Sequence, residues 1–143
     1  HADWFLLAGD LSALPAISVN LSKLPQNSVG YAVIEVPSAA DIQSLEHPDN
    51  VNVQWEINPS PNHDGNFLAS KINALTWLDG KPSVWAACEF NSMRNLRKLF
   101  QQKHEIEKDN LYLSSYWKMG QSEEEHKTAK RIDNEQNHSV KQS

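Results

Sequence analysis

The stretch Trp4-Phe-Leu-Leu-Ala-Gly-Asp-Leu-Ser-Ala-Leu-Pro-Ala-Ile17 contains, in order, an apolar run, a glycine and the start of a helix. The run Trp4–Leu7 does not alternate between apolar and polar residues, which predicts a parallel strand that is buried on both faces. Gly9 ends this strand, and Asp10 and Ser12 are residue types that commonly begin helices. A helix that starts here directs its free backbone N–H groups toward the turn. The stretch therefore predicts the strand-turn-helix unit with which α/β folds build a phosphate site.

The rest of the chain continues to alternate between expected strands and helices. Four further strands are expected, at residues 29–36, 51–57, 83–88 and 110–117. The second of these alternates in polarity, which is typical of an edge strand, and Asn91 is the expected cap of the helix that follows the third. Strands that alternate with helices form parallel sheets with right-handed crossovers. We therefore expect a three-layer α/β fold, with a five-stranded parallel sheet and helices on both faces.

The C-terminal part of the chain has a different composition. Ser122–Glu125 has the form of a capping box and predicts a polar helix to about residue 132, with only two apolar side chains to bury. The polar and charged residues 133–143 predict a disordered tail. We thus expect an α/β domain at residues 1–120, a C-terminal helix at 121–132 and the tail. The segment Asn58–Gly65 is dense in turn residues and predicts an exposed loop of the kind that often shapes a site.

The charge of the chain argues against a nucleic-acid partner. The net charge is −5, and residues 1–93 contain three lysines, no arginine and ten carboxylates. Nucleic-acid binding requires a net basic surface that displaces counterions from phosphates. The basic cluster of Arg94, Arg97 and Lys98 is interpreted as a solvated helix face.

The length and the cysteine content indicate the broad class of the protein. A chain of 143 residues is the size of one domain, and no apolar run approaches the ~20 residues that span a bilayer. The single cysteine, Cys88, forms no internal disulfide, and the first residues lack the pattern of a signal peptide. We therefore expect a cytoplasmic protein without a membrane anchor.

Three fold families share this order of elements: Rossmann-like nucleotide domains, flavodoxin-like domains and response-regulator receiver domains. A receiver domain needs an acidic pair after its first strand, and flavodoxins need a phosphate loop, and neither pattern is present. The passage Cys88-Glu-Phe-Asn-Ser-Met93 keeps the cysteine and methionine spacing of the passage that faces the nicotinamide in the ferredoxin reductase superfamily, although its Gly-Pro is replaced. The chain therefore resembles the NADP-linked, Rossmann-like domain of that superfamily.

Four passages together resemble a narrower branch, the C-terminal domain of siderophore-interacting proteins. They are Gly9–Ile17, Ile34–Val36, Ala87–Glu89 and Ser115–Glu124. The resemblance covers about residues 4–127 and implies a flavin-dependent ferric-siderophore reductase. In that family NADPH or NADH passes a hydride to FAD, and the reduced flavin reduces the Fe(III) of a ferric siderophore in single-electron steps to release Fe(II).

The resemblance also implies a second domain. Family members place an FAD-binding β-barrel before the α/β domain, and this chain has no room for one ahead of Trp4. We therefore expect the FAD-binding domain in a longer parent protein, and we expect the isolated domain to be inactive.

The same resemblance implies roles for particular residues. It implies cofactor binding by Gly9, Asp10, Ser12, Ala13, Glu35, Cys88, Glu89, Tyr116 and Trp117, the last two near the isoalloxazine ring of the flavin. Lys118 matches a basic position that faces the anionic siderophore. No residue is expected to be catalytic, because the cofactors carry the reaction. The histidines show no metal-ligand spacing.

Other interpretations of these residues stay open at this point. Asp10 also fits a helix N-cap, Cys88 a small core residue, Trp117 core packing and Lys118 a solvated side chain. Two other functions also stay open: a siderophore-binding carrier without reductase activity, and the reductase domain of another flavoprotein. The end of the second strand offers Glu35 but no arginine, and the choice between NADH and NADPH is not made from the sequence.

Overall fold

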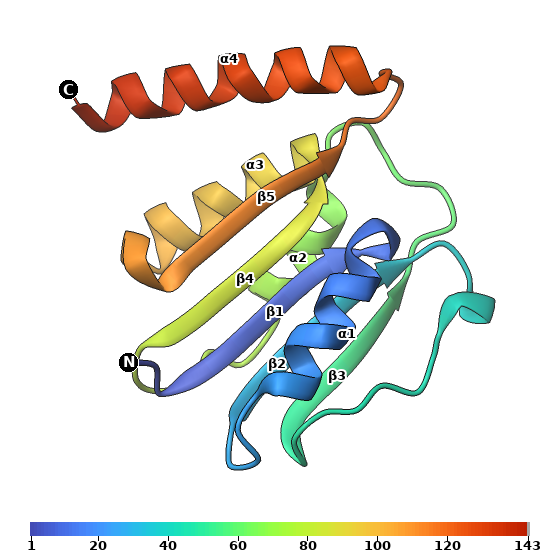
Figure 1. Ribbon diagram of the computed structural model, residues 1–143, viewed down its shortest axis with the longest axis vertical. Coiled ribbons are helices and arrows are strands. Elements are labelled where there is room, and N and C mark those ends of the chain that lie inside the picture. Colours follow the sequence, from blue (N-terminus) through green and yellow to red (C-terminus); the bar gives the residue numbers. More distant parts are fainter. Residues whose placement is uncertain (143) are drawn as a thin grey trace.

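The chain folds around a five-stranded parallel sheet in a computed structural model that describes residues 1–142 (Figure 1). The strands are β1 (Trp4–Asp10), β2 (Val29–Val36), β3 (Asn50–Ile57), β4 (Pro82–Glu89) and β5 (Leu111–Trp117). Their order is β3-β2-β1-β4-β5, and every neighbouring pair is parallel. The predicted sheet is therefore confirmed, with β3 at an edge as its alternating pattern indicates.

Helices lie on both faces of the sheet, which makes three layers. They are α1 (Leu14–Lys23), α2 (Asn66–Asn73), α3 (Phe90–Lys98) and α4 (Glu123–Gln142), with shorter helical turns η1 (Leu11–Ala13), η2 (Ala39–Asp41), η3 (Leu99–Lys103) and η4 (Lys108–Asn110). Buried side chains of α1 pack in one core with β1 and β2, whereas those of α2 and α3 pack in a second core with β1 and β4. The three-layer α/β class is therefore confirmed.

The spacing of apolar residues explains why each helix lies where it does. Leu14, Ile17 and Leu21 are three and four residues apart, so they form one stripe on α1 that is buried against the sheet. Leu96 and Phe100 do the same after the fourth strand and are fully buried in the other core. The sheet is thus held between two hydrophobic layers, and its carboxyl-terminal edge stays open.

Gly9 allows the first two central elements to approach closely. A Cβ atom at this position would lie 2.6 Å from the carbonyl oxygen of Ala87 on β4 and 2.9 Å from the Cδ1 atom of Ile17 on α1. Both distances are shorter than side chains accept, so only glycine fits. Gly9 therefore serves strand and helix packing, one of the roles of glycine in a first βα turn.

The third helix begins two residues earlier than its sequence suggests. It starts at Phe90, and the side chain of Glu89 caps it by accepting a hydrogen bond from the Ser92 N–H at 3.0 Å. Asn91, the predicted cap, instead donates to the carbonyl oxygen of His63 at 2.8 Å. A carboxylate at the strand end thus replaces the expected amide cap.

Helix α4 is longer than the sequence predicts. The capping box is confirmed, because the Glu125 N–H donates to Ser122 Oγ and Ser122 N–H to Glu125 Oε1. The helix then continues to Gln142, through residues for which a disordered tail is predicted, and only Ser143 of that tail lies outside the described residues. The prediction of a tail from residue 133 is therefore wrong for residues 133–142.

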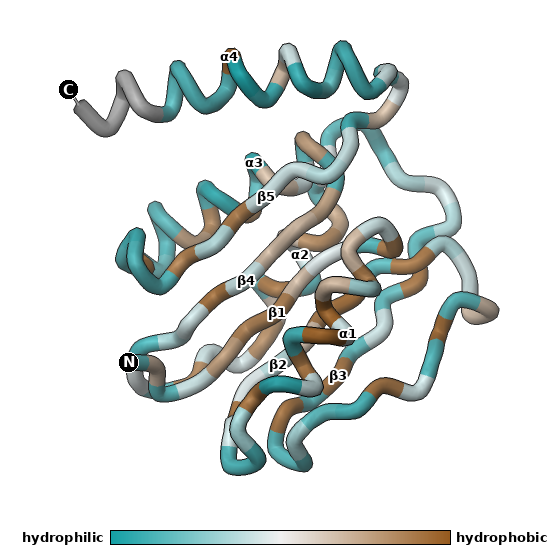
Figure 2. The backbone as a smooth tube through the Cα atoms, in the orientation of Figure 1, coloured by the Kyte–Doolittle hydropathy of each residue, from teal (hydrophilic) through white to brown (hydrophobic). Residues whose placement is uncertain are grey.

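The reason is a polar attachment that composition does not reveal. Arg97 of α3 donates two hydrogen bonds, of 2.9 and 2.8 Å, to the buried carboxylate of Asp133, and Arg94 Nε lies 3.4 Å from the same group. Earlier in the helix, buried His126 is hydrogen bonded to Ser115 of β5 at 2.8 Å. Figure 2 shows α4 mostly in hydrophilic colours, so charge pairing rather than an apolar stripe attaches it. None of the helices in residues 1–142 combines the length and hydropathy needed to cross a membrane.

We predict that Asp133→Asn detaches α4 from the rest of the fold. The substitution removes the charge that pairs with Arg97 and leaves a half-buried guanidinium without its partner. Hydrogen exchange of the α4 amides is expected to become about ten to a hundred times faster, with no change in β1 and β4. The control is Glu135→Gln, at an exposed position of the same helix. Unchanged exchange in Asp133→Asn would show that α4 does not depend on this pair.

Candidate functional site

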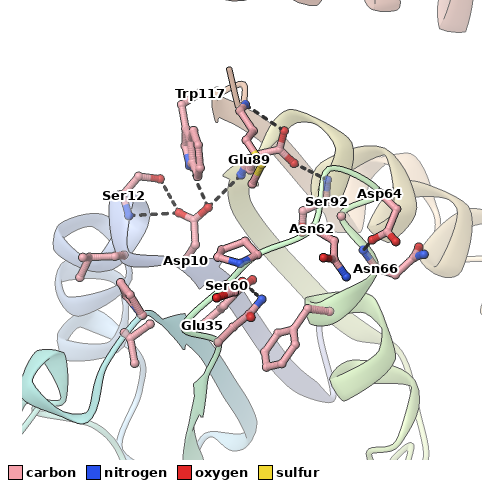
Figure 3. A pocket seen from close by; sticks show the side chains of 18 of the residues that line it. Asp10, Ser12, Glu35, Ser60, Asn62, Asp64, Asn66, Glu89, Ser92 and Trp117 are labelled. Atoms are coloured by element: carbon pink, nitrogen blue, oxygen red, sulfur yellow. Dashed lines mark hydrogen bonds between the residues drawn. The ribbon is translucent and has the colours of Figure 1, made fainter. Parts of the chain in front are cut away.

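A cleft of about 720 Å³ opens at the carboxyl ends of the central strands. It lies beside the ends of β1, β2 and β4, where the order of strands reverses in an open sheet, the place where α/β folds bind ligands. The loop after β3 and the start of α2 complete its wall. Figure 3 shows Asp10 at the centre, with Glu89 and Trp117 on one side and Glu35 on the other.

Asp10 is the centre of a buried hydrogen-bond network. One carboxylate oxygen accepts from the backbone N–H of Ser12 at 3.1 Å and from its hydroxyl. The other accepts from the Glu89 N–H at 2.9 Å and from the indole Nε1–H of Trp117 at 3.0 Å. The side chain is 8% exposed. Asp10 therefore joins the ends of β1, β4 and β5. Both of its carboxylate oxygens accept hydrogen bonds from the protein itself.

Glu89 makes a second set of contacts next to it. Its Oε1 caps α3, and its Oε2 accepts from the Met119 N–H at 3.3 Å. Because β4 ends at this residue, the side chain connects α3 with the segment that leaves β5. Together Asp10 and Glu89 hold Trp117 and Met119 against the cleft, as Figure 3 shows for Trp117.

Glu35 forms the opposite wall. It is paired in register with Asp10, and its Oε2 accepts a hydrogen bond of 2.9 Å from the Asn58 side chain. Burial raises the pKa of this carboxyl, the hydrogen bond from Asn58 opposes the shift, and the charges of Asp10 and Glu89 add to it. The Glu35 carboxylate is thus the half-buried acceptor at the ends of β2 and β3.

The loop between β3 and α2 is fixed to the neighbouring helix. Asn95 of α3 donates to the carbonyl oxygen of Asp64 at 2.7 Å, next to the Asn91 contact with His63. Gly65 has a φ of 67° and packs on the backbone of α3, where a Cβ atom would lie 2.5 Å from the Ser92 nitrogen. The loop is therefore a defined wall of the cleft.

The cleft is acidic. Four carboxylate side chains, those of Asp10, Glu35, Asp64 and Glu89, are part of its lining. Among the described residues that line it, none is a lysine, an arginine or a histidine. Its other polar groups are neutral hydroxyls and amides. Such a lining favours ligand groups that donate hydrogen bonds over groups that carry negative charge.

The structure brings five of the nine sequence-predicted cofactor residues to this cleft. Its lining includes Asp10, Ser12, Glu35, Glu89 and Trp117. The N-cap interpretation of Asp10 is also correct, because its side chain caps η1. These residues come from strand ends that are far apart in the sequence and adjacent in the sheet.

The remaining predicted residues lie outside the lining. Gly9, Ala13 and Cys88 are buried behind the cleft, and Tyr116 packs in the core on the α1 side. Lys118 also lies away from it, with its Nζ 4.6 Å from the centre of the Phe90 ring. These positions are close to the cleft along the chain, but neighbouring residues of a strand point to opposite faces.

Several lining residues were missed by sequence reasoning. Asn58, Ser60 and Asn62 belong to the loop after β3, and Phe67 and Ser70 to α2. The dense turn composition of the loop was a signal for the first group. No sequence signal identified the second group, since a helix residue reaches a site only through its packing. Among residues 1–137, whose side chains the structure describes, no cluster of three or more histidine, cysteine or acidic side chains suits a metal ion.

We predict that Asp10→Asn destabilises the chain by about 2–4 kcal/mol, since hydrogen bonds to a charged group are among the stronger ones. An amide presents two donors to a position where all four partners donate, so at least one buried N–H loses its acceptor. Urea unfolding measures the loss, and tryptophan emission reports release of Trp117. Asp49→Asn is the control, because Asp49 is exposed. Equal stability of the two variants would contradict the network.

We predict that the Cys88 thiol is unreactive in the folded chain. It is 1% exposed, and burial, with the nearby Asp10 carboxylate, raises its pKa far above the usual range of thiols. Iodoacetamide at pH 8 is expected to modify it about a hundred times more slowly than in urea-unfolded chain. Mass spectrometry reads the single site directly, because the chain has one cysteine. Equal rates in both states would mean that the thiol is accessible.

Comparisons of the sequence and of the fold with known proteins point to the same family. A family model described as siderophore-interacting protein matches residues 2–120. The ferric vibriobactin reductase ViuB of Vibrio cholerae is 38% identical over 125 residues, which are 86% of this chain and 46% of that protein. Among solved structures, the siderophore-interacting protein SipS from Aeromonas hydrophila aligns with a TM-score of 0.80 at 27% identity, over 99% of this chain and 54% of that one.

A siderophore utilization protein from T. fusca aligns with a TM-score of 0.77 at 26% identity, over 85% of this chain and 47% of that chain. The chain thus spans about half the length of the relatives that it matches. The match of the family model to most of the chain, together with the shared fold, establishes the relationship. The chain belongs to the siderophore-interacting protein family.

Proposed function

We propose that this chain is the nicotinamide-nucleotide-binding domain of a flavin-dependent ferric-siderophore reductase. The observation that carries the proposal is the cleft at the reversal of strand order, in a chain that resembles a ferric vibriobactin reductase over 86% of its length. Open α/β sheets bind their ligands at this place. The FAD-binding domain belongs, in this proposal, to the other half of a longer protein that works in the cytoplasm.

The residues of the cleft fit a nicotinamide nucleotide. Cofactor sites commonly have volumes of about 300–1,000 Å³, and 720 Å³ lies within this range. The carboxylate of Glu35 and the side-chain amides of Asn58 and Asn62 complement ribose hydroxyls and a carboxamide. A nicotinamide nucleotide held here would supply a hydride, and FAD in the other half of the longer protein would allow its two electrons to reach Fe(III) one at a time.

The chain contributes position rather than chemistry to this reaction. Asp10 orients Trp117 through its indole N–H, and Glu89 holds Met119 through its backbone N–H. Both carboxylates are satisfied within the protein, so they act as positioning residues. Trp117, 37% exposed, supplies a flat apolar wall for a planar ring.

The siderophore side of the proposal rests on two cations outside the cleft. Lys118 Nζ lies 4.6 Å and Arg94 Cζ 5.8 Å from the centre of the Phe90 ring. Arg94 also pairs with Asp133, its Nε lying 3.4 Å from the carboxylate, so Lys118 is the one of the two that is offered to an anionic ligand. We propose that Lys118 faces the ferric siderophore, whose catecholate or carboxylate groups are anionic.

The reaction itself is the test of this function. The full-length protein that contains this chain is mixed anaerobically with NADH or NADPH and a ferric catecholate siderophore, and Fe(II) is trapped with a chelator. We expect two Fe(II) for each nucleotide oxidised, because each nucleotide gives two electrons and each iron accepts one. The isolated chain is expected to reduce no iron.

The iron-free siderophore is the control and is expected to leave the nucleotide unoxidised. Failure of both nucleotides to react with the ferric siderophore would overturn the proposal. If the ferric siderophore bound while no nucleotide was oxidised, the protein would be a carrier.

A further inference from the structure

The carboxylate of Glu35, at the ends of β2 and β3, bears on whether the cleft binds NADH or NADPH. This inference rests on the proposed function. NADPH differs from NADH by one phosphate on the adenosine ribose, at the hydroxyl that an acidic residue near the end of the second strand often binds. Glu35 is the penultimate residue of β2 and lines the cleft.

The geometry leaves Glu35 able to accept a further hydrogen bond. Asn58 occupies its Oε2, and within residues 1–142 no side-chain or backbone donor is hydrogen bonded to its Oε1. Asp10, in contrast, has both oxygens occupied, and both oxygens of Glu89 also have partners. Glu35 is therefore the half-buried carboxylate of the cleft that has an acceptor free for a ligand hydroxyl.

The charge around Glu35 opposes a phosphate on the adenosine ribose. Asp10 is its register partner on β1, and Glu89 and Asp64 belong to the same lining. A phosphate monoester carries a charge of about −1.5 to −2 at neutral pH. No described lining residue carries a positive charge to balance it. Lys71 of α2 lies outside the lining, with its Nζ 5.2 Å from the ring centre of the lining residue Phe67.

We propose that Glu35 makes this domain selective for NADH over NADPH. Its free carboxylate oxygen accepts a hydrogen bond from the adenosine ribose hydroxyl. The 2′-phosphate of NADPH removes that donor and places negative charge against the acidic wall. Selectivity thus comes both from a hydrogen bond gained with NADH and from repulsion of NADPH.

Binding to the chain of 143 residues tests the proposal without any turnover. NADH and NADPH are titrated separately, and energy transfer from tryptophan to the reduced nicotinamide reports binding. We expect NADH to bind at least about ten times more tightly than NADPH, the range of one hydrogen bond to a charged group. Glu35→Gln keeps the shape and the contact with Asn58 but removes the charge, and it is expected to reduce this ratio about tenfold.

Glu56→Gln is the matched control. Glu56 is the register partner of Glu35 on β3 but does not line the cleft, so the ratio is expected to stay as in the parent chain. Glu35→Ser is a second variant with the same expected loss of selectivity if Glu35→Gln does not fold.

The outcomes separate this inference from the proposed function. Tighter binding of NADPH, or an unchanged ratio in both Glu35 variants, would overturn the inference and leave the proposed function intact. In the first case, loss of NADPH binding in Lys71→Gln would identify the cation responsible. Absence of binding of either nucleotide would overturn the proposed function and this inference with it.

Discussion

One carboxylate, that of Asp10, connects the parts of this protein that make up its site. It accepts hydrogen bonds from the turn after β1, from the last residue of β4 and from the indole at the end of β5. Glu89 and Trp117 follow Asp10 by 79 and 107 residues in the chain, so no local interaction brings them to it. A buried carboxylate that is surrounded only by donors favours one arrangement, because each buried donor left without its hydrogen bond reduces the free energy of unfolding. The position of Trp117 and the opening of the cleft both follow from this constraint.

The same network limits what the cleft can bind. The carboxylate oxygens of Asp10 and Glu89 already accept hydrogen bonds from the protein. These two side chains therefore give the cleft negative charge but few free acceptors for a ligand. Glu35 keeps one acceptor for a ligand. The basic side chains of α3 are used elsewhere, since Arg97 and Arg94 pair with Asp133 and attach α4. Lys118 lies outside the acidic cleft, beside Phe90, and is the cation that we propose for the anionic substrate.

Much of the fold was predictable because its signals are local. An unbroken apolar strand, a glycine and an apolar stripe at helical spacing each depend on a few neighbouring residues, as in Trp4–Ile17. The start of α4 was also predictable from a local signal, because Ser122 and Glu125 form hydrogen bonds with each other. Its end was not, because residues 133–142 look disordered by composition. The attachment of this segment depends on Arg97, thirty-six positions before Asp133. A pair so far apart in the chain cannot be recognised from a short stretch of sequence.

The sequence by itself determined the order of the elements, the parallel sheet and the strand ends at which a ligand site forms, because backbone periodicity and turn chemistry are properties of short segments. It also placed Asp10, Glu35, Glu89 and Trp117 at those ends. Only the tertiary structure decided which of these carboxylates still has a free acceptor, and that Cys88, Tyr116 and Lys118 point away from the cleft. The physical reason is that hydrogen-bond partners and side-chain direction depend on register between strands, which is set by packing of the whole sheet.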